Sequence, residues 1–180
     1  RTKITVDSIE KLREAMTKSN QEVVMKPGTY TMPNFINGRT GIEMSGSHNS
    51  LDLTGVTIHT PISLLSNPGR EDRRRRRGRS GFQVVHVSGD HVTLKGGTFD
   101  NPHPLHNGSP IDFGSYNQNP ANFPAQAMSE IRLSGDDIHM SDCKVTIRGS
   151  SPYGYGNIYG IGGGAAVELR KHSGILITGD

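Results

Sequence analysis

Three neighbouring residues late in the sequence, Arg170, Lys171 and His172, combine the side chains that an elimination reaction needs. β-Elimination of a uronic acid requires a base that removes the proton at C5 and a cation that neutralises the adjacent carboxylate. Lys171 is the candidate base, Arg170 the candidate cation and His172 a candidate proton donor. The alternative is a charged turn without chemistry, which the pattern by itself favours.

A glycine-rich segment just before these residues carries three tyrosines, Tyr153, Tyr155 and Tyr159. Tyrosine rings stack on sugar faces, and their hydroxyl groups can donate a hydrogen bond or a proton. We therefore predict that Tyr153 and Tyr159 contact substrate and that Tyr155 is a second candidate proton donor. The alternative is an ordered loop whose rings pack on neighbouring structure.

Two histidines, His103 and His106, lie in a proline-rich segment with the spacing His-x-x-His. Structural zinc sites use four ligands, and the prolines would interrupt a helix that presents both imidazoles on one face. We therefore predict a substrate contact or a plain polar loop here, and no metal site.

The most basic stretch runs from Arg70 to Arg79 and carries a net charge of +5, so the rest of the chain sums to −2. Guanidinium groups pair well with carboxylate and sulfate, which makes Arg75, Arg77 and Arg79 predicted contacts to an acidic polysaccharide. Nucleic-acid surfaces usually interleave aromatic rings with basic residues, and only Phe82 is near, so this partner is disfavoured. The alternative is a solvated loop whose like charges repel.

Asp136 and Asp137 form a carboxylate pair of the kind that glycoside hydrolases use. Asp90 and His91 occupy the same place in a repeat, so the pattern indicates a turn and not a unique site. Calcium is favoured by oxygen ligands, but no spacing here requires it, and the cofactor is left open. The aspartates that could supply such ligands are Asp52, Asp100 and Asp142.

The elements that hold these side chains are predicted from a repeat in the sequence. The segment 87–99 recurs at 133–145 and more loosely at 44–56, and its Ser-Gly turn returns after 43 and 46 residues. Each copy holds three short strands of alternating hydrophobicity, and self-similarity at this period is typical of a solenoid. We predict one all-β domain over residues 1–180: a right-handed parallel β-helix whose coils span 42–180. The last coil is incomplete, so we expect further chain or a partner on that end.

The composition agrees with a thin β core, since only 32% of residues are hydrophobic and 23 are glycine. The segments 61–82, 102–128 and 149–164 lack periodicity and are expected to be long loops on one side. Cys143, the single cysteine, is expected to be a small buried hydrophobic residue. The histidines that alternate with apolar residues are expected to be outward and solvated: His48, His59, His86, His91 and His139.

An amphipathic helix is predicted at the N-terminus as a cap on the open end of the repeat. Asp7 and Glu10 fit a capping box, and apolar residues follow at helical spacing. The strand after it ends in Pro-Gly-Thr-Tyr30. Over residues 4–31 this order resembles the N-terminus of the pectate-lyase-like β-helix superfamily, in particular its chondroitinase B and alginate lyase branch. The coils resemble that superfamily only by pattern.

The resemblance implies an extracytoplasmic protein, secreted or periplasmic, that acts on an acidic polysaccharide. The favoured activity is a lyase that cleaves by β-elimination, with calcium as the cofactor that often assists such enzymes. The alternatives are a glycoside hydrolase on the same fold and a structural or adhesive protein that binds glycans without cleaving them. No segment approaches the roughly 20 apolar residues of a membrane span, so no membrane partner is expected.

Overall fold

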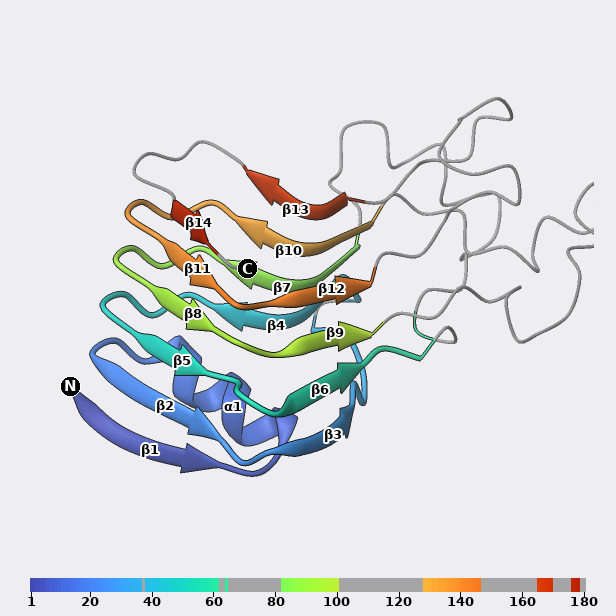
Figure 1. Ribbon diagram of the computed structural model, residues 1–180, viewed down its shortest axis with the longest axis horizontal. Helices are drawn as coiled ribbons and strands as arrows, with labels where there is room; N and C mark the ends of the chain where they lie inside the picture. The colour runs from blue at the N-terminus through green and yellow to red at the C-terminus, as the bar shows by residue number, and fades with distance from the viewer. Residues whose placement is uncertain are drawn as a thin grey trace, which may run out of the picture.

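The computed structural model describes residues 1–36, 38–61, 64, 82–100, 128–146, 165–169 and 176–178. Their strands form three parallel sheets of six, four and four strands (Figure 1). Sheet A contains β1 (Thr2–Val6), β2 (Gln21–Met25), β5 (Ser50–Asp52), β8 (Thr93–Lys95), β11 (His139–Ser141) and β14 (Leu176–Thr178). Sheet B contains β3 (Gly28–Thr31), β6 (Val56–His59), β9 (Thr98–Asp100) and β12 (Lys144–Thr146). Sheet C contains β4 (Thr40–Met44), β7 (Phe82–Val87), β10 (Met128–Leu133) and β13 (Ala165–Leu169).

The chain visits the sheets in a fixed order. It runs from sheet C to sheet A to sheet B through β4, β5 and β6, and repeats that order through β7–β9 and β10–β12. Residues that are equivalent in the sequence repeat become neighbours in the sheets, as in the register Leu51, Leu94, Met140 of sheet A. These three side chains are buried, so each copy of the repeat places its apolar residues on those of the previous copy.

The predicted fold class, an all-β right-handed parallel β-helix, is wrong for the described structure. The three sheets are open, with no strand pairing that joins one sheet to another among the described residues. The core is also not all β, because helix α1 (Ile9–Thr17) contributes four buried residues to it. A repeat in the sequence determines which residues stack in register, but it does not determine whether the sheets close on one another. The described architecture is therefore three open parallel sheets with one helix.

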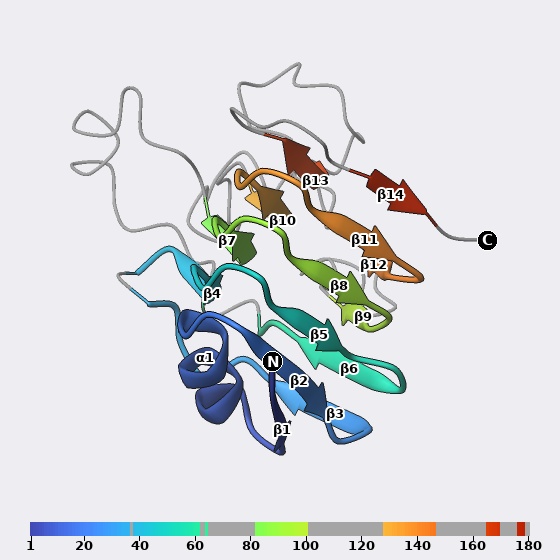
Figure 2. The same ribbon diagram turned by 90° about the vertical axis from the view of Figure 1, so that its left-hand side faces the viewer.

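Helix α1 covers the edge of sheet C at β4, as Figure 2 shows. Its buried face is formed by the residues predicted from their spacing: Ile9, Leu12, Ala15 and Met16. Arg13 Nε donates to the Gly41 carbonyl at 2.8 Å, and the Met16 carbonyl accepts from the Gly46 N–H at 3.0 Å. The helix thus supplies polar partners to an edge that would otherwise lack them. The described helix is nine residues long, and no helix in this part of the chain could cross a membrane.

The start of α1 differs from the predicted capping box. Ser8 is the N-cap, and its side chain accepts from the Lys11 N–H at 3.2 Å. Asp7 instead pairs with Lys11 Nζ at 2.7 Å. Both residue types can cap a helix, and the chain uses the serine because it lies one position nearer the first helical turn.

The connections from sheet C to sheet A stack as Ser-Gly turns. His48, His91 and Asp137 take the left-handed conformation in successive turns, with φ of 59°, 54° and 53°. The rings of His48 and His91 stack with centroids 4.6 Å apart, and His91 Nδ1 lies 2.6 Å from Asp137 Oδ2. The prediction that the Asp136–Asp137 pattern follows turn structure is confirmed.

Candidate functional site

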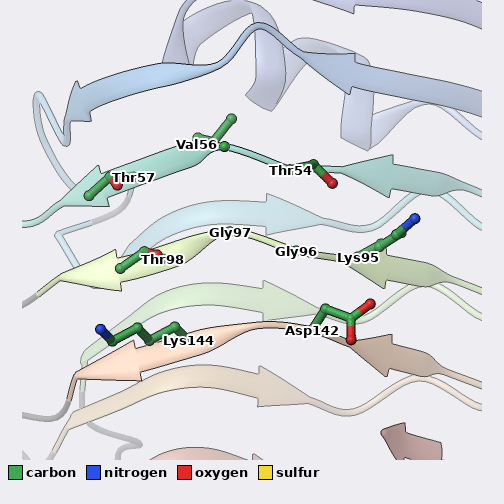
Figure 3. A pocket seen from close by; sticks show the side chains of 10 residues that line it. Thr54, Val56, Thr57, Lys95, Gly96, Gly97, Thr98, Asp142 and Lys144 are labelled. Atoms are coloured by element: carbon green, nitrogen blue, oxygen red, sulfur yellow. The ribbon is translucent and has the colours of Figure 1, made fainter. Parts of the chain in front are cut away.

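An open depression of about 470 Å³ lies where sheet A passes into sheet B (Figure 3). We call it the groove. It spans three successive copies of the repeat, because its residues come from the β5–β6, β8–β9 and β11–β12 connections and the strands beside them. Its lining is formed by Thr54, Gly55, Val56, Thr57, Lys95, Gly96, Gly97, Thr98, Asp142 and Lys144.

The floor of the groove is bare backbone. Gly96 and Gly97 have φ of +71° and +92°, a conformation that other residues rarely adopt. A Cβ at Gly97 would lie 2.9 Å from the Leu53 side chain, and one at Gly96 would lie 3.0 Å from the Thr54 nitrogen. Glycine is therefore required at both positions by the close approach of residues 53–54, and it leaves this part of the groove without side chains.

Two lysines flank that floor. In Figure 3, Lys95 at the end of β8 lies at one end of the Gly96–Gly97 segment, and Lys144 at the start of β12 lies on the neighbouring strand, beside Thr98 at the other end. Both residues are exposed. Thr57, Thr98 and Lys144 are neighbours in the register of sheet B, so hydroxyl groups continue the polar wall. The arrangement suits an extended ligand that carries both carboxylates and hydroxyl groups.

One carboxylate, Asp142, lies between the lysines in the β11–β12 connection. A second, Asp52, is beside Lys95 in the register of sheet A. Hydrogen bonds from Thr54, with a smaller contribution from Lys95, hold the pKa of Asp52 below its ordinary value. Asp52 is not part of the groove lining, so the lining holds the single carboxylate of Asp142 and not the pair that a glycoside hydrolase uses. The charge pattern of the groove therefore favours anion binding over acid-pair hydrolysis.

Cys143 lies behind the groove floor. Its Sγ donates to the Gly96 carbonyl at 3.0 Å, and the side chain is half-buried against the core, close to the position predicted for it. Burial, with a contribution from the charge of Asp142, raises the pKa of the Cys143 thiol to about 11. The Cys143 thiol therefore stabilises the backbone of the groove floor and is not a nucleophile.

This environment predicts slow alkylation of Cys143. Because only the thiolate reacts, a pKa of about 11 in place of 9.0 should slow iodoacetamide labelling about 100-fold relative to the unfolded chain below pH 9. Intact-mass kinetics in buffer and in urea, with the rate followed from pH 7 to pH 10, would measure this ratio. Equal rates in the folded and unfolded chain would contradict the buried position.

The residues predicted from the sequence to be catalytic or to bind substrate lie outside the described part of the chain. Arg170, Lys171 and His172 come between β13 and β14 in the sequence, outside the described ranges. The other predicted residues outside the described ranges are Tyr153, Tyr155, Tyr159, Arg75, Arg77, Arg79, His103 and His106.

The groove was not predicted from the sequence, although the repeat carries a signal for it. In register, Lys144 occupies the place of Thr98, which puts Asp142 at the place of Gly96. Two charged residues thus enter a turn that is otherwise built from glycine and threonine. Departures of this kind from a structural repeat are where a binding surface is expected.

A calcium ion, which the resemblance suggested, does not fit the groove. Hard cations take six or more oxygen ligands, with several from carboxylates, and the groove lining offers the single carboxylate of Asp142 between two ammonium groups. Over the described ranges, no group of three or more histidine, cysteine, aspartate or glutamate side chains could hold a metal ion.

No protein-family model matches the chain, and no curated protein matches it in sequence. The similarity of residues 4–31 to pectate-lyase-like proteins stays a prediction.

Proposed function

We propose that this protein is an extracytoplasmic, polysaccharide-active protein that binds a uronic-acid glycan in the groove and cleaves it by β-elimination. The observation that carries the proposal is the pair of exposed lysines, Lys95 and Lys144, that flank a bare glycine floor. A uronate chain presents carboxylates at intervals and hydroxyl groups between them, which matches ammonium groups alternating with threonine hydroxyls.

Lys95 and Lys144 would attract the glycan carboxylates electrostatically, at positions exposed to solvent. An exposed ion pair contributes about 0.2–1 kcal/mol, so each lysine is worth a few-fold in affinity and both together about ten-fold. Salt should weaken the interaction, because exposed charges are screened over about 10 Å at 0.1 M ionic strength. A neutral glycan of the same length would lack this salt dependence.

The elimination would proceed as a balanced proton transfer. A base removes the C5 proton, the C4–O bond breaks as the C4–C5 double bond forms, and a donor protonates the departing oxygen. A cation at the carboxylate stabilises the charge that develops on it. In our proposal Lys171 is the base, Arg170 the cation, and Tyr155 or His172 the donor.

The test is the absorbance of the unsaturated uronate product after incubation with alginate, pectate, chondroitin sulfate and ulvan, with and without calcium. We expect a rise with one of these polymers that is abolished in Lys171→Ala. The double variant Lys95→Ala/Lys144→Ala should raise KM about ten-fold, with kcat little changed, because it removes binding but not the base. Lys11→Ala, which removes an exposed lysine of helix α1 that is not part of the groove lining, is the matched control.

A second candidate function is glycan binding without cleavage, favoured by the described groove lining, which holds no histidine, tyrosine or pair of carboxyl groups. Affinity electrophoresis in gels that contain each polymer separates the two candidates. Retardation that depends on Lys95 and Lys144, without unsaturated product or new reducing ends, would establish the binder. Absence of both product and retardation for every polymer would contradict the proposed function.

A further inference from the structure

A second group of polar side chains lies on sheet C, on a different sheet from the groove. The register of sheet C places Glu43 of β4 beside His86 of β7, and His86 beside Arg132 of β10. Ile42 and Val85, the residues that precede Glu43 and His86, are buried in the core. Because successive strand residues point to opposite faces, Glu43 and His86 face outward together.

The His86 imidazole bridges a carboxylate and a hydroxyl group. Its Nδ1 lies 3.0 Å from Glu43 Oε2, and its Nε2 lies 2.7 Å from Ser134 Oγ. Ser88 Oγ donates to the other carboxylate oxygen of Glu43. The side chains of His86 and Glu43 are 21% and 28% exposed, so the group is partly shielded from water yet reachable. His86 faces outward as predicted, but the prediction that it is solvated is wrong, because its ring is largely covered by Glu43 and Ser134.

The proton positions in this group follow from Glu43. Burial by itself raises the pKa of Glu43, but the hydrogen bonds from His86 and Ser88 outweigh it and leave the pKa below its ordinary value. An ionised carboxylate can only accept, so Nδ1 of His86 must carry the proton. In the neutral imidazole, Nε2 is then a lone-pair acceptor that faces the Ser134 hydroxyl.

We infer that Ser134, His86 and Glu43 form a nucleophilic site that hydrolyses carboxylic esters with a small acyl group. A hydroxyl within hydrogen-bond reach of a base that is itself oriented by a third group is the geometric signature of an activated serine. Ser134 and His86 are the catalytic residues, and Glu43 is a positioning residue. Ser134 is half-buried, so the acyl group must be small. The Ser134 hydroxyl can also donate to the Val87 carbonyl at 3.4 Å, a longer contact than the 2.7 Å to His86 Nε2. This activity is independent of the groove.

The reaction balances without a cofactor. Ser134 Oγ attacks the ester carbon and its proton passes to His86 Nε2, which returns it to the departing alcohol as the acyl-oxygen bond breaks. Water then hydrolyses the acyl-serine by the same proton route. The N–H of Gly135 makes a 3.3 Å bond to the Val87 carbonyl, which also accepts from the Ser134 N–H at 2.8 Å. Both N–H groups are therefore already bonded, and no backbone donor is assigned to the oxyanion.

The test uses the full chain with a fluorophosphonate probe and with p-nitrophenyl acetate. We expect one covalent adduct on the wild-type protein, located at Ser134 by peptide mapping, together with turnover of the ester. Ser134→Ala should abolish both, and His86→Gln should slow both about 10²- to 10⁴-fold. Ser50→Ala, a half-buried serine on a strand of sheet A, should leave both unchanged.

The substitution Glu43→Gln tests whether Glu43 orients the His86 imidazole for catalysis or only stabilises the fold. The amide keeps the size of the side chain but lacks the carboxylate charge that orients the imidazole, so kcat for p-nitrophenyl acetate should fall while KM is unchanged and the adduct stays at Ser134. Arg132, the charged residue on the other side of His86 in the register, is retained in this variant. Failure of the wild-type protein to form an adduct, or an adduct at any other residue, would overturn the inference whatever the variants do.

Discussion

Replacing Gly89 with alanine should lower the free energy of unfolding by about 3 kcal/mol. The Ser-Gly turns stack so closely that a Cβ at Gly89 would overlap the Gly46 carbonyl group, with its carbon 2.7 Å away. The backbone cannot retreat, because the Gly89 N–H donates to the Met44 carbonyl at 3.0 Å. The overlap is with backbone and not with a flexible side chain, so relaxation must disturb two turns. Urea unfolding followed by circular dichroism measures the loss.

The control for this substitution is Ser45→Ala in the preceding turn. Ser45 is exposed, and truncating an exposed residue usually changes stability by no more than about 0.5 kcal/mol. Unfolding midpoints for Gly89→Ala and Ser45→Ala that both equal the wild-type value would show that the turns are not stacked as described.

Asn49→Val is the second substitution with a large expected effect, also about 3 kcal/mol. Asn49 is fully buried, and its Oδ1 accepts from the Gln21 N–H at 2.8 Å while Nδ2 donates to the Lys18 carbonyl at 2.7 Å. Valine has a similar size but no polar atoms, so it would leave both backbone groups buried without these partners. Calorimetry of the variant and the wild-type protein measures the effect.

The hydrogen bonds of Asn49 explain why position 49 departs from the sequence repeat. In the next two copies of the repeat, apolar Val92 and Ile138 take the equivalent place. Asn49 instead lies against the α1–β2 connection, whose free backbone groups need partners that an apolar side chain cannot supply. Ser50→Val, on the adjacent half-buried strand position, should stay within about 0.5 kcal/mol of the wild-type protein. If Asn49→Val were equally mild, the backbone groups would have to find other partners.

Much of the strand arrangement could be predicted from the repeat. The alternation around Leu51, Leu94 and Met140 correctly indicated which residues are buried, and their equivalence in sequence became their register in sheet A. Two features could not be predicted. Closure depends on how the sheets meet, which alternation does not encode, and the choice of Ser8 over Asp7 as N-cap depends on a side-chain contact to Lys11.

The candidate sites were harder to predict for a related reason. His86 alternates with apolar residues just as the other histidines do, and only the fold brings Glu43 and Ser134, 43 and 48 residues away, to its two nitrogens. Lys144 looked like an ordinary strand residue until the register placed it across the floor from Lys95. The residues that did look chemical in sequence, such as Lys171, lie outside the described part of the chain.

The measurement that tests the central claim most directly is an NMR titration of the ¹⁵N-labelled protein with short oligogalacturonate and oligoalginate chains. We predict saturable shifts of the Gly96, Gly97 and Thr98 amides with one of them, weakened by added salt and about ten-fold weaker in Lys95→Ala/Lys144→Ala. Shifts confined to residues outside the groove, or unchanged affinity in the double variant, would contradict the assignment of the groove as the glycan-binding surface.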